Sequence, residues 1–137
     1  MVLDPVMEKI VSLAVKNDDI DALWLYGSRA QDREIKSSDY DLAIAFKRFN
    51  LSPTNKLLRP NELAIDWADD LAIDTELISI VDINTVPIYL AFNIVEYGRV
   101  IYSSDTGREF KEQDRIYSRY EFDLKESENN EYRFDNV

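Results

Sequence analysis

The order of apolar and polar positions predicts alternating helices and strands in the first third of the chain. Apolar residues recur every three or four positions over residues 3–15, which is the spacing of an amphipathic helix. Short apolar runs at residues 22–26 and 40–46 are typical of buried strands. Between them, residues 27–30 are expected to turn the chain into a short helix.

The middle of the chain continues this alternation. Residues 49–60 are predicted to form a loop or partial helix, because Pro53 and Pro60 interrupt them. Asn61 is expected to cap the next helix. The elements that follow are a helix over 61–71, a strand over 73–80, a helix over 84–97 stopped by Gly98, and a strand over 100–102.

The pattern changes after residue 104. Residues 106–124 are expected to form a surface helix, and residues 121–137, with six acids and two bases, to be frayed or disordered alone. We therefore predict one α/β (α+β) domain over residues 1–104, a small mixed sheet flanked by helices, extended by a partner-contacting helix and acidic tail over 105–137. Trp24 and Trp67 are expected in the core. Five aromatic residues of the extension either pack back onto the domain or dock a partner: Tyr117, Tyr120, Phe122, Tyr132 and Phe134.

Composition narrows the available chemistry. The 137 residues include no cysteine and no histidine. This excludes disulfides, thiolate chemistry, ordinary zinc sites and Ser-His or Cys-His catalytic pairs. An enzyme built from this chain must use carboxylates, which favour Mg²⁺ or Mn²⁺.

The net charge is −11, with 16 basic and 27 acidic residues. Such a chain repels nucleic acid, so direct nucleic-acid binding is not expected. The charge either keeps the protein soluble or meets a basic partner. No apolar run is long enough to span a membrane and the first residues do not read as a signal peptide, so we expect a cytoplasmic protein without membrane contact.

Candidate catalytic residues gather between the first two strands. Ten residues separate Ser28 from Asp39, and Asp41 follows two residues later. Two carboxylates at this spacing in a strand point to the same face, where a divalent cation would relieve their repulsion. A third carboxylate, from Glu76 or Asp74 on the strand predicted at 73–80, could bind a second metal or activate an attacking hydroxyl.

The Gly27-Ser28 step is a candidate phosphate contact. Glycine allows the backbone to approach a phosphate, and the following helix start and the Ser28 hydroxyl add donors. Arg29 or Arg33 could neutralise further phosphate charge, or serve surface solubility alone. Neither a P-loop nor a dinucleotide fingerprint is present.

These motifs resemble the signature of the DNA polymerase β-like nucleotidyltransferases. Within that superfamily the chain is most similar to the minimal nucleotidyltransferase (MNT) antitoxins of HEPN/MNT toxin–antitoxin pairs. The resemblance spans roughly residues 5–102 and is carried by the segments YGSRA at 26–30, SDYDL at 38–42 and GRVIY at 98–102.

The resemblance implies the nucleotidyltransferase fold and AMP transfer from ATP to a tyrosine of a cognate HEPN ribonuclease toxin, in a hetero-oligomeric complex. Gly27 and Ser28, helped by Arg29, would hold the triphosphate. Asp39 and Asp41 would bind Mg²⁺ or Mn²⁺, and Glu76 occupies the aligned position of the third carboxylate, with Asp74 as its rival. The family usually has aspartate there and often has Arg-Gly after the alanine, where this chain has Gln31-Asp32.

Two other functions fit the sequence. An antitoxin could neutralise its partner by binding and masking alone, given the acidic, aromatic C-terminal region. A small-molecule nucleotidyltransferase ranks lowest, because the chain is short for an added acceptor domain.

Overall fold

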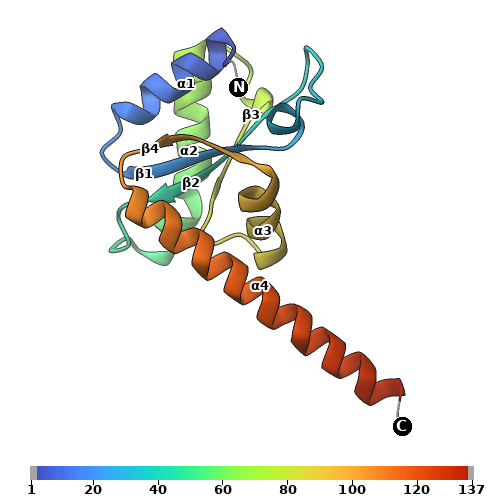
Figure 1. The fold of residues 1–137 in the computed structure, drawn as a ribbon. Coiled ribbons are helices and arrows are strands. Elements are labelled where there is room, and N and C mark those ends of the chain that lie inside the picture. Colours follow the sequence, from blue (N-terminus) through green and yellow to red (C-terminus); the bar gives the residue numbers. More distant parts are fainter. Residues whose placement is uncertain (1–2, 136–137) are drawn as a thin grey trace.

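The protein is a four-stranded mixed sheet with helices on both faces (Figure 1). A computed structural model describes residues 3–135, with side chains described through residue 130. The predicted fold class is confirmed. In chain order the elements are α1 (Pro5–Val15), β1 (Ile20–Tyr26), η1 (Ser28–Gln31), β2 (Tyr40–Phe46), α2 (Pro53–Leu71), η2 (Thr75–Leu77), β3 (Ile78–Asp82), α3 (Ile88–Tyr97), β4 (Arg99–Ser103) and α4 (Thr106–Asp135).

The strand order β3-β2-β1-β4 brings the candidate residues to one end of the sheet. β1 runs antiparallel to β2, so the last residue of β1, Tyr26, pairs with Asp41 near the start of β2. β3 runs parallel to β2, and its second residue, Ser79, pairs with Asp41. Three strand ends therefore meet around Asp41.

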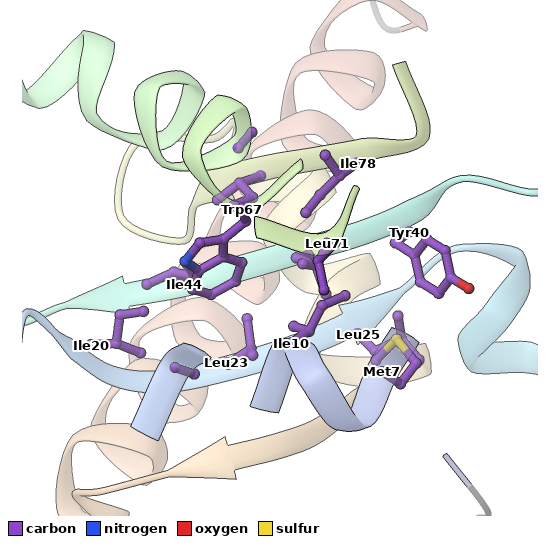
Figure 2. Close-up of a cluster of buried hydrophobic side chains, with 14 of the residues drawn as sticks. Met7, Ile10, Ile20, Leu23, Leu25, Tyr40, Ile44, Trp67, Leu71 and Ile78 are labelled. Carbon is purple, nitrogen blue, oxygen red and sulfur yellow. The ribbon is translucent and has the colours of Figure 1, made fainter. Parts of the chain in front are cut away.

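Two apolar clusters, one on each face of the sheet, hold the helices in place. α1 and α2 cover one face, where Trp67 packs among aliphatic side chains such as Ile10 and Ile44 (Figure 2). On the other face, small strand residues such as Ala43 and the large Trp24 belong to one buried cluster with Ala91 and Ile94 of α3 and Ile116 of α4. Both tryptophans are 3% exposed or less, which confirms their predicted place in the core.

Helix α2 begins within residues 49–60, which were predicted as a loop or partial helix, so Asn61 lies inside the helix and the prediction that it caps a helix is wrong. The helix begins at Pro53, with Ser52 as its cap: the Ser52 hydroxyl accepts from the Asn55 N–H at 3.1 Å. Proline at the first helical position suits this start, because its missing N–H would have no partner there. Pro60 lies inside the helix and is buried. Burial on the apolar face helps offset the hydrogen bond that Pro60 removes.

The strand predicted over residues 73–80 is wrong in its first half. Asp74 caps the short helical turn η2, which carries Glu76, and β3 starts only at Ile78. The α3 helix likewise begins at Ile88, after a turn in which the Asp82 carboxylate accepts from the Asn84 N–H at 2.8 Å. Local hydrogen bonds therefore shorten both elements: a backbone bond from the Leu77 N–H to the Asp74 carbonyl at 3.0 Å closes η2, and the Asp82 side chain closes the turn before α3.

The expectation of a frayed or disordered stretch over residues 121–137 is also wrong up to Asp135, where α4 ends. Its second half runs away from the body of the domain (Figure 1). The side chains of Tyr132 and Phe134, which were candidate docking residues, lie outside those that the structure describes. No helix within residues 3–135 is long and apolar enough to cross a membrane.

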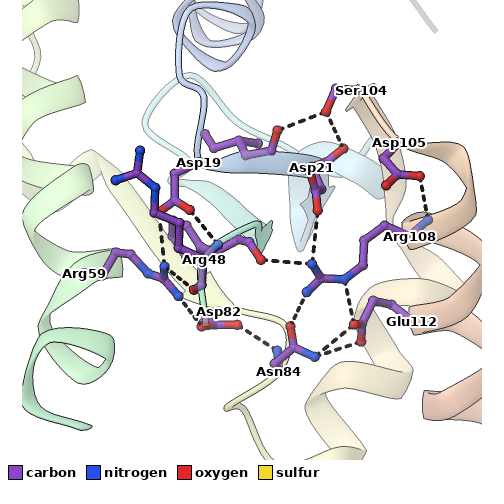
Figure 3. A network of polar contacts seen from close by, with 12 residues as sticks. Asp19, Asp21, Arg48, Arg59, Asp82, Asn84, Ser104, Asp105, Arg108 and Glu112 are labelled. Carbon is purple, nitrogen blue, oxygen red and sulfur yellow. Dashed lines mark hydrogen bonds and ion pairs between the residues drawn. The ribbon is translucent and has the colours of Figure 1, made fainter. Parts of the chain in front are cut away.

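A buried polar network ties the start of α4 to the end of the sheet opposite Asp41 (Figure 3). The Arg108 guanidinium donates to Asp21 Oδ2 at 3.1 Å, to the Phe46 carbonyl at 2.9 Å and to Asn84 Oδ1 at 2.7 Å. Its Nε also pairs with Glu112 Oε1 at 2.9 Å. Since both partners of this ion pair are largely buried and fully hydrogen-bonded, the network fixes the direction in which α4 leaves the domain.

Candidate active site

Gly27 takes a conformation that only glycine adopts readily. Its φ of 74° and ψ of −156° end β1 and begin η1. A Cβ at this position would collide with Oδ2 of Asp41. The glycine is therefore required both by the turn and by the close approach of the Asp41 carboxylate to the backbone.

Asp39 immediately precedes β2 and Asp41 is the second residue of that strand. Asp41 is half-buried and Asp39 is exposed. Burial, and then the negative charge of Asp39, raise the pKa of the Asp41 carboxyl. The neighbouring Tyr26 hydroxyl has its pKa raised to about 12 by burial and by the charge of Asp41. This concentration of uncompensated negative charge is what a bound cation would relieve.

Ser28 begins η1, which has only four residues. The turn is closed by backbone bonds from the Ala30 N–H to the Gly27 carbonyl at 3.2 Å and from the Arg33 N–H to the Ser28 carbonyl at 2.9 Å. So short a helix carries little macrodipole. Close backbone approach at Gly27 therefore supports phosphate binding better than the predicted helix dipole does.

Arg29 is engaged by the protein itself. Its Nε and Nη2 donate to the Ser38 carbonyl at 3.1 and 2.8 Å, and its Nη1 lies 3.4 Å from Asp4 Oδ2. The guanidinium also stacks over the Tyr40 ring at 3.9 Å, and the side chain is only 11% exposed. Arg29 therefore holds the residue immediately before Asp39, and the other predicted cation, Arg33, is exposed.

Arg99 was not predicted as part of the site. From the start of β4 its Nε donates to the Ala30 carbonyl at 2.8 Å, and its Nη2 lies 3.4 Å from Asp32 Oδ2. It thus fastens η1 to the sheet. The Gly98-Arg99 pair of the sequence signature was the signal that could have identified it.

The local structure around the predicted third carboxylate differs from the strand that the sequence predicted. Glu76 and Asp74 are exposed on η2 and its cap, ahead of the strand, and the residue in register with Asp41 is Ser79. Among the described side chains, residues 3–130, no group of three or more acidic residues stands close enough to hold a metal ion. The two aspartates are brought together, whereas Glu76 is not placed on their strand face.

A hollow on the described surface lies away from these residues. Its volume is about 460 Å³, and it is lined by residues around the start of β1, including Asp18, Asp19 and Asp70. β1 starts at the end of the sheet opposite Gly27. We place the chemistry at Gly27 because the backbone geometry and the carboxylates coincide there.

A family model described as "Polymerase beta, Nucleotidyltransferase" matches residues 8–107. The chain belongs to this nucleotidyltransferase family. The matched segment contains all of the candidate site. No curated protein sequence matches the chain.

Solved structures share the fold. A toxin–antitoxin crystal structure with AMP-PNP has a TM-score of 0.69 at 22% identity, covering 88% of this chain and 90% of that one. A structure of the tri-AMPylated Shewanella oneidensis HEPN toxin in complex with an MNT antitoxin gives a TM-score of 0.64 at 19% identity, covering 88% of each chain. A structure of the MntA-HepT toxin–antitoxin gives 0.63 at 20%, covering 88% and 89%. The predicted resemblance to MNT antitoxins is thus confirmed at the level of the fold.

Proposed function

We propose that this protein is an MNT-type antitoxin that transfers AMP from ATP to a tyrosine of a cognate HEPN toxin. The observation that carries the proposal is the contact between Gly27 and Asp41. It puts a backbone turn open to phosphate beside two carboxylates, within a chain of the nucleotidyltransferase family. The similar fold of an antitoxin solved with an AMPylated HEPN toxin supports the choice of acceptor. We expect the pair to act in the cytoplasm.

The residues present fit a hard divalent ion. Asp39 and Asp41 offer only oxygen ligands, and the chain has no histidine or cysteine to favour a softer metal. Mg²⁺ or Mn²⁺ bound there would neutralise the charge of the triphosphate during its displacement. Glu76 stays a candidate third ligand from η2, with Asp74 as the alternative.

The remaining residues of the site bind the triphosphate or position the metal-binding loop. Gly27 and the Ser28 hydroxyl face the phosphates, while Arg29 holds the loop before Asp39 through Ser38. The oxygen of the acceptor tyrosine forms a bond to the α-phosphorus as the bond to the β-phosphate oxygen breaks. The tyrosine loses its proton, pyrophosphate leaves and AMP remains on the toxin. Catalysis arises mainly from positioning and electrostatics.

Labelled ATP tests the assignment directly. The chain is incubated with Mg²⁺, α-labelled ATP and the protein encoded by the adjacent gene. We expect label on that protein, lost with Asp39→Asn plus Asp41→Asn. The matched control, Asp18→Asn plus Asp70→Asn, removes two exposed acids at the other end of the sheet and should keep full transfer. Transfer that survives the first pair contradicts the site.

Neutralisation by binding alone is the second candidate, and the exposed side chains of α4 favour it. In that case the Asp39→Asn plus Asp41→Asn variant should still neutralise the toxin fully, and the toxin should gain no mass.

A further inference from the structure

One side of α4 is presented to solvent in a fixed direction. Ile116 is fully buried, and the Arg108 network anchors the helix to the sheet end. Tyr120 stacks on Phe92 of α3 with ring centroids 3.8 Å apart. Beyond this stack the helix leaves the domain (Figure 1). An anchored helix of this kind can dock a partner without first being ordered, which avoids an entropic cost.

An apolar stripe follows one side of α4. Phe110, Tyr117 and Leu124 lie seven residues apart and are 60%, 38% and 47% exposed. Seven residues are two helical turns, so the three side chains line up over about 21 Å. Tyr117 is held in place at the middle of the stripe: its hydroxyl donates to Glu96 Oε2 at 2.8 Å, and its ring meets Phe92 edge-on. A stripe with this period is the form in which one helix receives another.

Acidic residues border the stripe with the same period. Asp114, Glu121 and Glu128 each follow a stripe residue by four positions and are exposed. Glu121 pairs with Lys125 at 3.2 Å, but both side chains are about two-thirds exposed. A pair of this kind contributes little and is readily exchanged for another cation.

We propose that the stripe of Phe110, Tyr117 and Leu124 on α4 is a docking surface for a basic amphipathic helix of the partner protein. Its apolar side would cover the stripe, and its lysines or arginines would face the acidic border. A second copy of this chain is a poor occupant, because α4 against α4 would bring acidic borders together. The partner's identity rests on the proposed function, whereas the surface does not.

Affinity for the adjacent gene's product, titrated with the full chain, tests the surface. We expect Phe110→Ser plus Leu124→Ser to weaken binding by about tenfold or more, which corresponds to about 1.4 kcal/mol. Phe122→Ser is the matched control: Phe122 is 54% exposed on the same helix but lies off the stripe, so its loss should change affinity less than twofold. Circular dichroism checks that each variant keeps its helix.

The role of the acidic border and the identity of the segment that docks on the stripe are tested in the same complex. Replacing Asp114, Glu121 and Glu128 by their amides should slow association and reduce its dependence on salt. Hydrogen exchange should show protection on a lysine- or arginine-rich helix of the partner. The inference would be overturned by any of four results. The stripe variant could bind with unchanged affinity, or Phe122→Ser could weaken binding equally. Hydrogen exchange could protect an acidic segment of the partner, or the chain could form a homodimer that the stripe variant dissociates.

The outcomes separate this inference from the proposed function. Stripe-dependent binding without any AMP transfer would contradict the proposed reaction and leave the surface intact. AMP transfer together with binding that does not depend on the stripe would support the proposed reaction and contradict the docking surface.

Discussion

Replacement of Gly27 by alanine should damage the fold slightly and the site severely. The backbone at Gly27 lies at φ 74° and ψ −156°, where a side chain costs about 1–3 kcal/mol. The added methyl group would also collide with Oδ2 of Asp41. Relief requires the carboxylate or the turn to shift, and a misplacement of about 1 Å can cost roughly a hundredfold in rate. We therefore expect a free energy of unfolding lower by about 1–3 kcal/mol, with AMP transfer reduced by about a hundredfold or more.

Urea denaturation and initial rates of AMP transfer, measured on the same preparation, check both effects. Gly107→Ala is the control, because Gly107 has no positive φ and a Cβ there would meet only Asp105 Oδ1, at 3.2 Å. Its free energy of unfolding should stay within about 0.5 kcal/mol of the wild type and its rate should not change. Gly27→Ala with full activity would refute the close approach of Asp41, whatever its stability.

Three further changes test other parts of the structure. Replacement of Arg29 by lysine or by methionine should lower kcat by about tenfold and leave KM for ATP nearly unchanged. Neither side chain can make the two hydrogen bonds that Arg29 donates to the Ser38 carbonyl. Full activity of Arg29→Lys would instead indicate that Arg29 contacts the phosphates directly. Ser79→Asp should tighten Mn²⁺ binding by roughly tenfold in calorimetry, since it adds a ligand charge in register with Asp41, whereas weaker binding in Glu76→Gln would identify Glu76 as the third ligand. Glu112→Gln should lower the free energy of unfolding by about 2 kcal/mol at pH 7, measured by urea denaturation, because buried Arg108 loses one of its two carboxylate partners and keeps only Asp21. Burial acts to raise the pKa of the Glu112 carboxyl, but hydrogen bonds from Asn84, Arg115 and Arg108 outweigh it and lower that pKa. Its contribution is therefore full above the ordinary pKa of glutamate and fades as the pH falls through the lowered value, so the variant and the wild type should converge in acid; a difference that is constant with pH would contradict this.

Local patterns in the sequence predicted the positions of those candidate residues that depend on neighbouring residues. Gly27, Asp39 and Asp41 follow from one loop between two adjacent antiparallel strands, so their spacing alone determines that they meet. The local structure around Glu76 was predicted wrongly, whereas its role as a ligand stays a prediction. The apolar residues from Ile73 to Ile80 resemble one strand, but Asp74 caps a helical turn that delays β3 to Ile78.

Long-range contacts could not be predicted from the sequence. Arg29 looked like a free cation because its partners, Asp4 and the Ser38 carbonyl, come together only in the folded chain. The continuation of α4 was missed because its acidic composition suggested disorder. Nothing in the local pattern shows that Arg108 anchors the start of that helix to the sheet.

Intact-mass analysis of the co-expressed partner tests the central claim most directly. With the wild-type chain, the partner should carry one or more added AMP units, which peptide mapping places on a tyrosine hydroxyl. With Asp39→Asn plus Asp41→Asn, the partner should keep its unmodified mass, while Asp18→Asn plus Asp70→Asn should behave as the wild type. A partner that is neutralised but unmodified by the wild-type chain, or still modified by the Asp39→Asn plus Asp41→Asn variant, would contradict the proposed activity or its site.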